Sequence, residues 1–150
     1  MPQDFEANWQ AQVFEAFRQE LKPVPGIAAA LDQLTIPICV ASGSDPARIR
    51  LSLELAGLLP RFEGRLFSAT QVARGKPAPD LFLLAARSLG AAPARCVVVE
   101  DSVPGVQAAV AAGMPVFGYA ARNSAALLAQ AGAVVFDDMA RLPGLIEQLP

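Results

Sequence analysis

The stretch that decides the fold is RCVVVEDSVPG, residues 95–105. Its four apolar residues, CVVV, are followed directly by two acids, Glu100 and Asp101, and then by Ser102 and Gly105. An apolar, β-branched run that ends in a turn predicts a buried central strand. In a parallel sheet the carboxyl end of such a strand opens onto the crevice where ligands bind. The sequence therefore places two acids where chemistry usually takes place.

The adjacent acids Glu100 and Asp101 predict a metal site. Side chains alternate along a strand, but the alternation ends where the strand passes into a loop, so both carboxylates can turn toward one site. Like charges this close resist joint ionisation unless a cation lies between them, and hard carboxylate oxygens suit Mg²⁺. A structural interpretation stays open: Asp101 or Ser102 caps the next helix, whose dipole favours the acids.

Length and composition bound the remaining possibilities. A chain of 150 residues can bury one good core, so a single domain is expected. The chain is 53% hydrophobic with a net charge of -2, which argues against disorder and against nucleic-acid binding. It has no apolar run of the about 20 residues that span a bilayer, and its amino terminus is unlike a signal peptide. We therefore expect a soluble cytoplasmic protein without a membrane partner.

Two residue types limit the chemistry further. The chain has no histidine, which excludes Ser-His-Asp and Cys-His catalysis and all histidine metal ligands. Carboxylates, lysine, hydroxyls and backbone amides remain available. Cys39 and Cys96 each lie in an apolar run, so we expect two small buried side chains in a reducing compartment.

Hydrophobic patterns and turn residues predict five strands that alternate with helices. The predicted strands are residues 37–41, 65–69 at the sheet edge, 96–99, 115–119 and 133–136. The predicted helices are residues 27–34, 45–58, 80–89, 104–112, 124–131 and 139–149, of which Asp45 and Asp80 cap two and Pro143 interrupts the last. Alternating strands and helices need parallel crossovers, so the predicted class is a doubly wound parallel α/β sheet.

The amino-terminal residues predict an element outside this pattern. An amphipathic helix is expected over residues 4–21, because apolar side chains recur every four positions at Phe5, Trp9, Val13, Phe17 and Leu21. The sequence KPVPG at residues 22–26 cannot continue a helix and predicts a stiff hinge.

Two further motifs carry polar groups. Ser42-Gly43-Ser44 follows a predicted strand and precedes a helix, where a hydroxyl and unpaired N–H groups make an anion site. Lys76 lies in a loop bracketed by prolines and supplies a compact positive charge for the same anion. Each motif also has a structural interpretation, a turn and cap for the serines and an ordinary surface side chain for the lysine. Together with the acids they predict a bound phosphate and its divalent counter-ion.

The order of these motifs resembles the haloacid dehalogenase-like (HAD) superfamily of phosphohydrolases, in particular its phosphoglycolate phosphatase and β-phosphoglucomutase-like group. The matching stretches are VASGS at 40–44, ARGKPAPDLF at 73–82 and VVVEDSVPGVQAA at 97–109. The resemblance implies that Ser42 and the Gly43 amide hold phosphoryl oxygens and that Lys76 neutralises them. It also implies that Glu100 and Asp101 bind Mg²⁺, with Asp101 the more direct ligand, in a phosphatase or phosphomutase for a small phosphorylated metabolite.

One motif of that family is missing. Its members begin with a strand carrying a DxD pair, whose first aspartate attacks phosphorus, followed by a helical cap; no DxD occurs in this sequence. By this resemblance residues 1–21 are the remnant of a cap, and residues 22–150 form an α/β core without its first, central strand. We therefore expect an amino-terminally truncated form that cannot make the aspartyl-phosphate.

The resemblance implies that the missing strand lies between the strands that end at Ser42 and Glu100. Its absence leaves two unpaired strand edges. Either Val40 pairs directly with the neighbourhood of Val98, or the chain forms a homo-oligomer through these edges.

Two other functions stay open. One is a catalytically silent domain that acts through oligomerisation or partner binding, with the apolar face of residues 4–21 exposed. The other is a receiver-like signalling domain, where an acidic pair also binds Mg²⁺. Receivers need a later lysine, and none follows Asp137 and Asp138, so this alternative is the weaker one.

Overall fold

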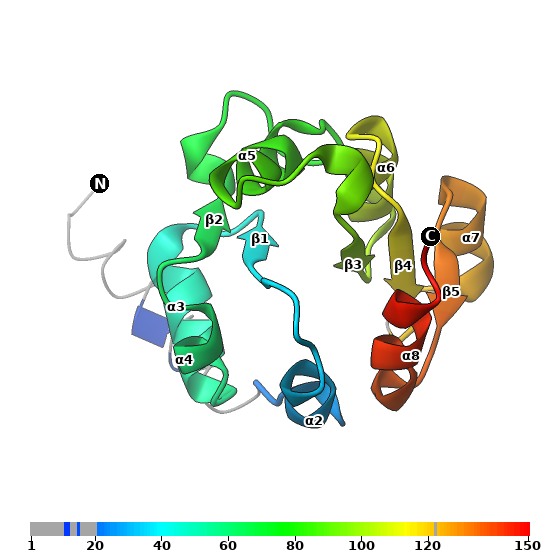
Figure 1. Cartoon of the computed structure of the whole chain (residues 1–150). Helices are drawn as coiled ribbons and strands as arrows, with labels where there is room; N and C mark the ends of the chain where they lie inside the picture. Colours follow the sequence, from blue (N-terminus) through cyan, green and yellow to red (C-terminus); the bar gives the residue numbers. More distant parts are fainter. Residues whose placement is uncertain (1–10, 13–14, 16–20, 122) are drawn as a thin grey trace.

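The computed structural model describes residues 11, 12, 15, 21–121 and 123–150 (Figure 1). Strands and helices alternate along these residues, as the sequence predicted. The strands are β1 (Val40–Ser42), β2 (Leu66–Ser68), β3 (Val98–Glu100), β4 (Val116–Tyr119) and β5 (Val134–Phe136). The helices are α2 (Ile27–Asp32), α3 (Pro46–Leu55), α4 (Leu59–Phe62), α5 (Asp80–Ser88), α6 (Val103–Ala111), α7 (Ala125–Ala131) and α8 (Leu142–Glu147). Three short 3-10 helices complete the order: η1 (Ala69–Gln71), η2 (Pro93–Arg95) and η3 (Met139–Arg141).

The strands form two separate parallel sheets within the described residues. One contains β1 and β2, with Val40 opposite Leu66, and the other has the order β3-β4-β5, with Val98 opposite Val116. All pairs are parallel, which confirms the predicted α/β class, and β2 lies at a sheet edge as expected. The sheets are short, at three or four residues a strand.

The prediction of a buried central strand at residues 96–99 is wrong. The strand covers Val98–Glu100 and lies at the edge of its sheet, and Val99 is 38% exposed. The alternative in which Val40 pairs with the Val98 neighbourhood is also wrong, since these residues belong to different sheets. Among the described residues β3 pairs with β4 alone, and the Lys76 side chain contacts both Ala41 of β1 and Glu100 of β3.

Each of these two strands pairs on one side only within the described residues. The Val40 amide donates to Arg65 on the β2 side, and the Val98 amide donates to Pro115 on the β4 side. Because successive residues of a strand direct their N–H and C=O groups to opposite sides, Ala41 and Val99 direct theirs away from these partners. Thus β1 and β3 each have one edge without a strand partner in the described part of the chain.

Helices α5 and α6 join the two sheets on one face. Helix α5 contacts β1 and β2, α6 contacts β3 and β4, and the two helices contact each other (Figure 1). Helix α5 buries the stripe Leu81, Phe82, Ala85 and Ala86, the spacing that an amphipathic helix presents to a core. On the other face α2 packs against η3 and α8, around a cluster of Ala30, Phe117, Phe136, Met139 and Leu142.

Several element boundaries follow from local chemistry. Asp45 caps α3 by accepting a hydrogen bond from the Arg48 amide at 3.0 Å. The helix predicted for residues 45–58 ends at Leu55, because Gly57 adopts a left-handed φ of 72° before α4 begins. Asp80 is the first residue of α5 and pairs with Arg74, so it does not cap that helix. Pro143 lies in the first turn of α8 and does not interrupt it.

Three other expectations concern the chain ends and the cysteines. The helix predicted over residues 4–21 falls almost entirely outside the described residues. Cys39 and Cys96 are half-buried, which corrects the prediction of two buried side chains. Burial still raises the pKa of both thiols.

Among the described residues, no helix has the length and apolar character needed to cross a membrane.

Candidate active site

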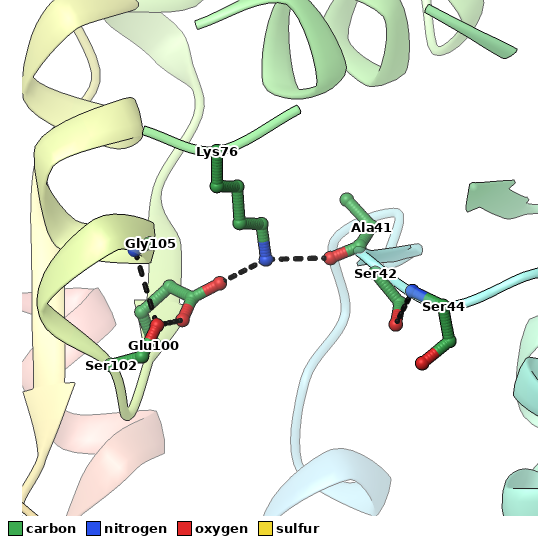
Figure 2. Close-up of polar contacts among 7 residues, drawn as sticks. All are labelled: Ala41, Ser42, Ser44, Lys76, Glu100, Ser102 and Gly105. Atoms are coloured by element: carbon green, nitrogen blue, oxygen red, sulfur yellow. Dashed lines mark hydrogen bonds and ion pairs between the residues drawn. The ribbon is translucent and has the colours of Figure 1, made fainter. Parts of the chain in front are cut away.

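Lys76 lies between the carboxyl ends of β1 and β3. The loop from η1 to α5 carries it, and its bond to Pro77 is cis. Its Nζ atom donates a hydrogen bond to the carbonyl oxygen of Ala41 at 3.1 Å and forms an ion pair with Oε1 of Glu100 (Figure 2). The ammonium also lies 5.0 Å from the ring centroid of Phe82, a cation–π distance. The Lys76 side chain is 16% exposed, so its charge is largely screened from water by protein.

Glu100 ends β3 and is held from two sides. Its side chain is 9% exposed, with Oε1 on Lys76 and Oε2 accepting a hydrogen bond from the Ser102 hydroxyl at 3.2 Å. The same hydroxyl caps α6 by accepting a hydrogen bond from the Gly105 amide at 3.1 Å. Of the two cap residues that the sequence allowed, Ser102 is therefore the one used.

The serine motif lies one residue beyond the Lys76 contact on β1. The Ser42 hydroxyl accepts a hydrogen bond from the Ser44 amide at 3.1 Å. A Cβ on Gly43 would meet nothing within 4 Å, so the backbone of this loop is open on that side. The Ser44 carbonyl in turn accepts a hydrogen bond from the buried Ser68 hydroxyl at 2.6 Å, which ties the loop to β2.

Asp101 is exposed, whereas the Glu100 side chain is 9% exposed. Its backbone carbonyl accepts a hydrogen bond from the Asn123 side chain at 2.9 Å. The described residues contain no group of three or more acidic, cysteine or histidine side chains that could hold a metal ion. Glu100 already contacts an ammonium, so of the two adjacent acids Asp101 is the one without a described cationic partner.

The structure thus brings together some of the predicted residues. Lys76, Glu100 and the residue before Ser42 meet at one place, although they are far apart in the sequence. The Ser42 hydroxyl is engaged within its own loop, and Glu100 pairs with the lysine. Sequence reasoning missed this pairing and the close approach of Glu100 to Gly105. The available signal was a glycine inside the first turn of a helix, where it costs stability unless something approaches closely.

This arrangement defines an α/β protein with a charged site at the carboxyl ends of its parallel strands. The profile of the haloacid dehalogenase-like hydrolases matches residues 3–113, and the chain belongs to this family. The resemblance seen in the motifs is therefore confirmed.

Two curated relatives are phosphatases of Escherichia coli strain K12. The 6-phosphogluconate phosphatase is 31% identical over 137 residues, which are 91% of this chain and 62% of that protein. Hexitol phosphatase A is 47% identical over 94 residues, 60% of this chain and 42% of that protein. The chain therefore spans less than two thirds of the length of either relative.

Solved structures agree with the family assignment. A haloacid dehalogenase-like protein of unknown function from Agrobacterium tumefaciens is 35% identical with a TM-score of 0.87, covering 98% of this chain and 70% of that one. A HAD family hydrolase from Deinococcus radiodurans, solved with bound phosphate and sodium, is 35% identical with a TM-score of 0.83, covering 97% and 68%. A Thermotoga maritima protein provisionally described as a beta-phosphoglucomutase is 27% identical with a TM-score of 0.86, covering 98% and 70%. These likenesses support the phosphatase and β-phosphoglucomutase-like group.

Proposed function

We propose that this chain carries the phosphate-binding core of a Mg²⁺-dependent phosphohydrolase or phosphomutase-like protein that acts on a small phosphorylated metabolite. The observation that carries the proposal is the position of Lys76 between the ends of β1 and β3, beside Ser42 and Glu100. Relatives that hydrolyse sugar phosphates support the substrate class. The assignment of residues 1–21 to a remnant of the family's cap is part of this proposal, and the family match includes these residues from residue 3 onward.

Each site residue has a role in this proposal. Lys76 neutralises the phosphoryl oxygens, and Ser42 with the Gly43 amide binds them. Two unit charges about 4 Å apart interact by about 4 kcal/mol at an effective dielectric of 20. A phosphate and the Glu100 carboxylate would repel each other by about this much, so the phosphate can approach only because the Lys76 ammonium lies between them. Glu100 holds that ammonium in place, since its carboxylate contacts Lys76.

The described acids fit Mg²⁺ only in part. Glu100 is engaged by Lys76, and Asp101 is the exposed carboxylate beside it. Mg²⁺ is commonly held by one or two carboxylates together with substrate phosphate and water, which a single Asp101 satisfies. When bound there, Mg²⁺ would neutralise charge on the phosphoryl oxygens. We assign no covalent step, because no DxD pair occurs among the 150 residues.

Binding and turnover can be tested separately. We expect the chain to bind inorganic phosphate in the presence of Mg²⁺, as measured by calorimetry, and not to hydrolyse para-nitrophenyl phosphate. Lys76→Ala should weaken phosphate binding by about tenfold or more, the effect of losing a charged hydrogen bond. Lys22→Ala is the matched control, because Lys22 is exposed and outside the site. A wild-type chain that binds no phosphate would contradict the proposal.

A second candidate is a catalytically silent domain that forms a homo-oligomer. The unpartnered edges of β1 and β3 and the exposed Val99 favour it, because free strand edges are templates for pairing. Sedimentation velocity should then show a dimer that Val99→Lys dissociates, since a lysine at an edge opposes pairing. A wild-type chain that stays monomeric at high concentration would exclude this candidate.

A further inference from the structure

Gly105 occupies an unusual position against the Glu100 carboxylate. A Cβ atom at Gly105 would lie 2.0 Å from Oε2, 2.1 Å from Cδ and 2.6 Å from Oε1 of Glu100. Non-bonded atoms do not approach this closely, so the carboxylate fills the space that any other side chain at position 105 would need. We call this space the Gly105 seat.

The backbone does not explain the glycine. Gly105 is the third residue of α6, and it is not among the glycines with positive φ. A glycine inside a helix is destabilising relative to alanine, by up to about 1 kcal/mol. The chain contains a natural comparison in Gly144, the third residue of α8, which also follows a proline. A Cβ at Gly144 would meet nothing within 4 Å, so space is the difference between the two positions.

The seat connects α6 to Lys76 through three contacts. The Gly105 amide donates to the Ser102 hydroxyl, and that hydroxyl donates to Oε2 of Glu100 (Figure 2). The other carboxylate oxygen pairs with the ammonium of Lys76, which also donates to the carbonyl oxygen of Ala41 and lies over the Phe82 ring. The position of the carboxylate therefore determines where the ammonium lies.

We propose that Gly105 is a positioning residue for Lys76: the seat fixes the Glu100 carboxylate, and the carboxylate holds the ammonium at the end of β1. The bearing of this seat on phosphate binding rests on the function proposed above. Its existence rests on the distances alone, so it can be tested without any phosphate.

The test uses the two lysines of the chain. Lys22 is exposed and Lys76 is not, so a limiting dose of acetylating reagent followed by peptide mass spectrometry gives an internal ratio of labelling. In the wild-type chain we expect Lys76 to react about tenfold slower than Lys22, because a charged hydrogen bond protects it. Gly105→Ala should remove most of this difference, and the matched control Gly144→Ala should leave it unchanged.

A second pair of variants separates the seat from a general effect on folding. Glu100→Ala removes the carboxylate that the new Cβ would meet. Adding Gly105→Ala to Glu100→Ala should therefore leave the Lys76 labelling unchanged and should not lower the thermal transition, since alanine inside a helix is more favourable than glycine once the carboxylate is gone. If Gly105→Ala alone does not fold, folding of the double variant supports the seat.

Two outcomes would overturn the proposal. One is a folded Gly105→Ala chain in which Lys76 stays as protected as in the wild type. The other is a double variant that is as damaged as Gly105→Ala alone. Neither readout uses phosphate binding or turnover, so a failed seat and a failed phosphatase proposal give different results.

Discussion

The Nζ atom of Lys76 lies 3.1 Å from the carbonyl oxygen of Ala41, a residue 35 positions earlier in the chain. The same ammonium pairs with Glu100, 24 positions later. Since Ala41 belongs to β1 and Glu100 to β3, one loop residue connects two sheets that share no backbone pairing among the described residues. Lys76 therefore has a structural role that can be measured apart from any ligand.

Replacing Lys76 by alanine should destabilise the chain. The Glu100 side chain, 9% exposed, would lose its counter-ion, and removing one partner of a buried pair is costly. We expect the free energy of unfolding to fall by about 2 to 4 kcal/mol, measured by urea denaturation. Lys22→Ala should cause no change. The double variant Lys76→Met, Glu100→Gln should recover most of the loss, and a single variant as stable as Lys22→Ala would contradict the structural role.

Gly118 should not tolerate alanine. Its added Cβ would lie 2.9 Å from the Cβ of Ala133 and 3.2 Å from the Cβ of Leu128. Both neighbours are buried and are fixed to the backbone at the contacting atom, so they cannot rotate away. We expect Gly118→Ala to lower the free energy of unfolding by about 1 to 3 kcal/mol through overpacking. Gly144→Ala should raise it by up to about 1 kcal/mol instead. If Gly118→Ala and Gly144→Ala changed the free energy of unfolding equally, the packing of β4 against α7 would be contradicted.

The Cys39 thiol should make stability depend on alkaline pH. Burial raises the pKa of Cys39 in the folded state. A raised folded pKa contributes stability that is complete below the pKa of the unfolded thiol, about 8.5, and is lost as the pH rises above it. The urea midpoint should therefore fall between about pH 8 and pH 10. Cys39→Ala should show a smaller fall over that range than the wild type, whatever its own stability at neutral pH. Parallel curves would contradict the shift.

Asp101 should affect ligand binding without affecting stability. The side chain is exposed, so Asp101→Asn should change the free energy of unfolding by less than about 0.5 kcal/mol. If Asp101 holds Mg²⁺, Asp101→Asn should reduce the gain in phosphate affinity that Mg²⁺ produces by about tenfold or more. Loss of a residue that only supports a metal ligand already lowers metal affinity by about tenfold. Asp137→Asn is the matched control, an exposed acid directly after β5. Calorimetry with and without Mg²⁺ checks both, and equal effects of the two variants would count against Asp101.

Local features were predictable because neighbouring residues create them. The cap at Asp45 and the choice of Asp101 or Ser102 as the cap of α6 followed from residue type and position. The end of α3 was placed too late because Gly57 stops the helix with a left-handed φ before Leu58. Errors of this kind are small, since each concerns a single turn of the chain.

The site was predictable as a set of residues and not as a set of contacts. Ser42, Lys76 and Glu100 could be named because strand ends and helix starts expose polar groups. The pairing of Glu100 with Lys76 could not be predicted, because the same carboxylate can pair with a metal ion or with a lysine ammonium. Which partner it contacts depends on the space beside Gly105, and that space exists only once α6 packs against β3.

The sequence by itself determined the α/β order, the family and the residues that carry charge, because these depend on patterns within a few turns of chain. Only the tertiary structure decided that β1 and β3 do not pair with each other and that Lys76 joins β1 to Glu100. The reason is that strand neighbours and ion-pair partners are set by the packing of segments distant in the chain, about which no local pattern carries information.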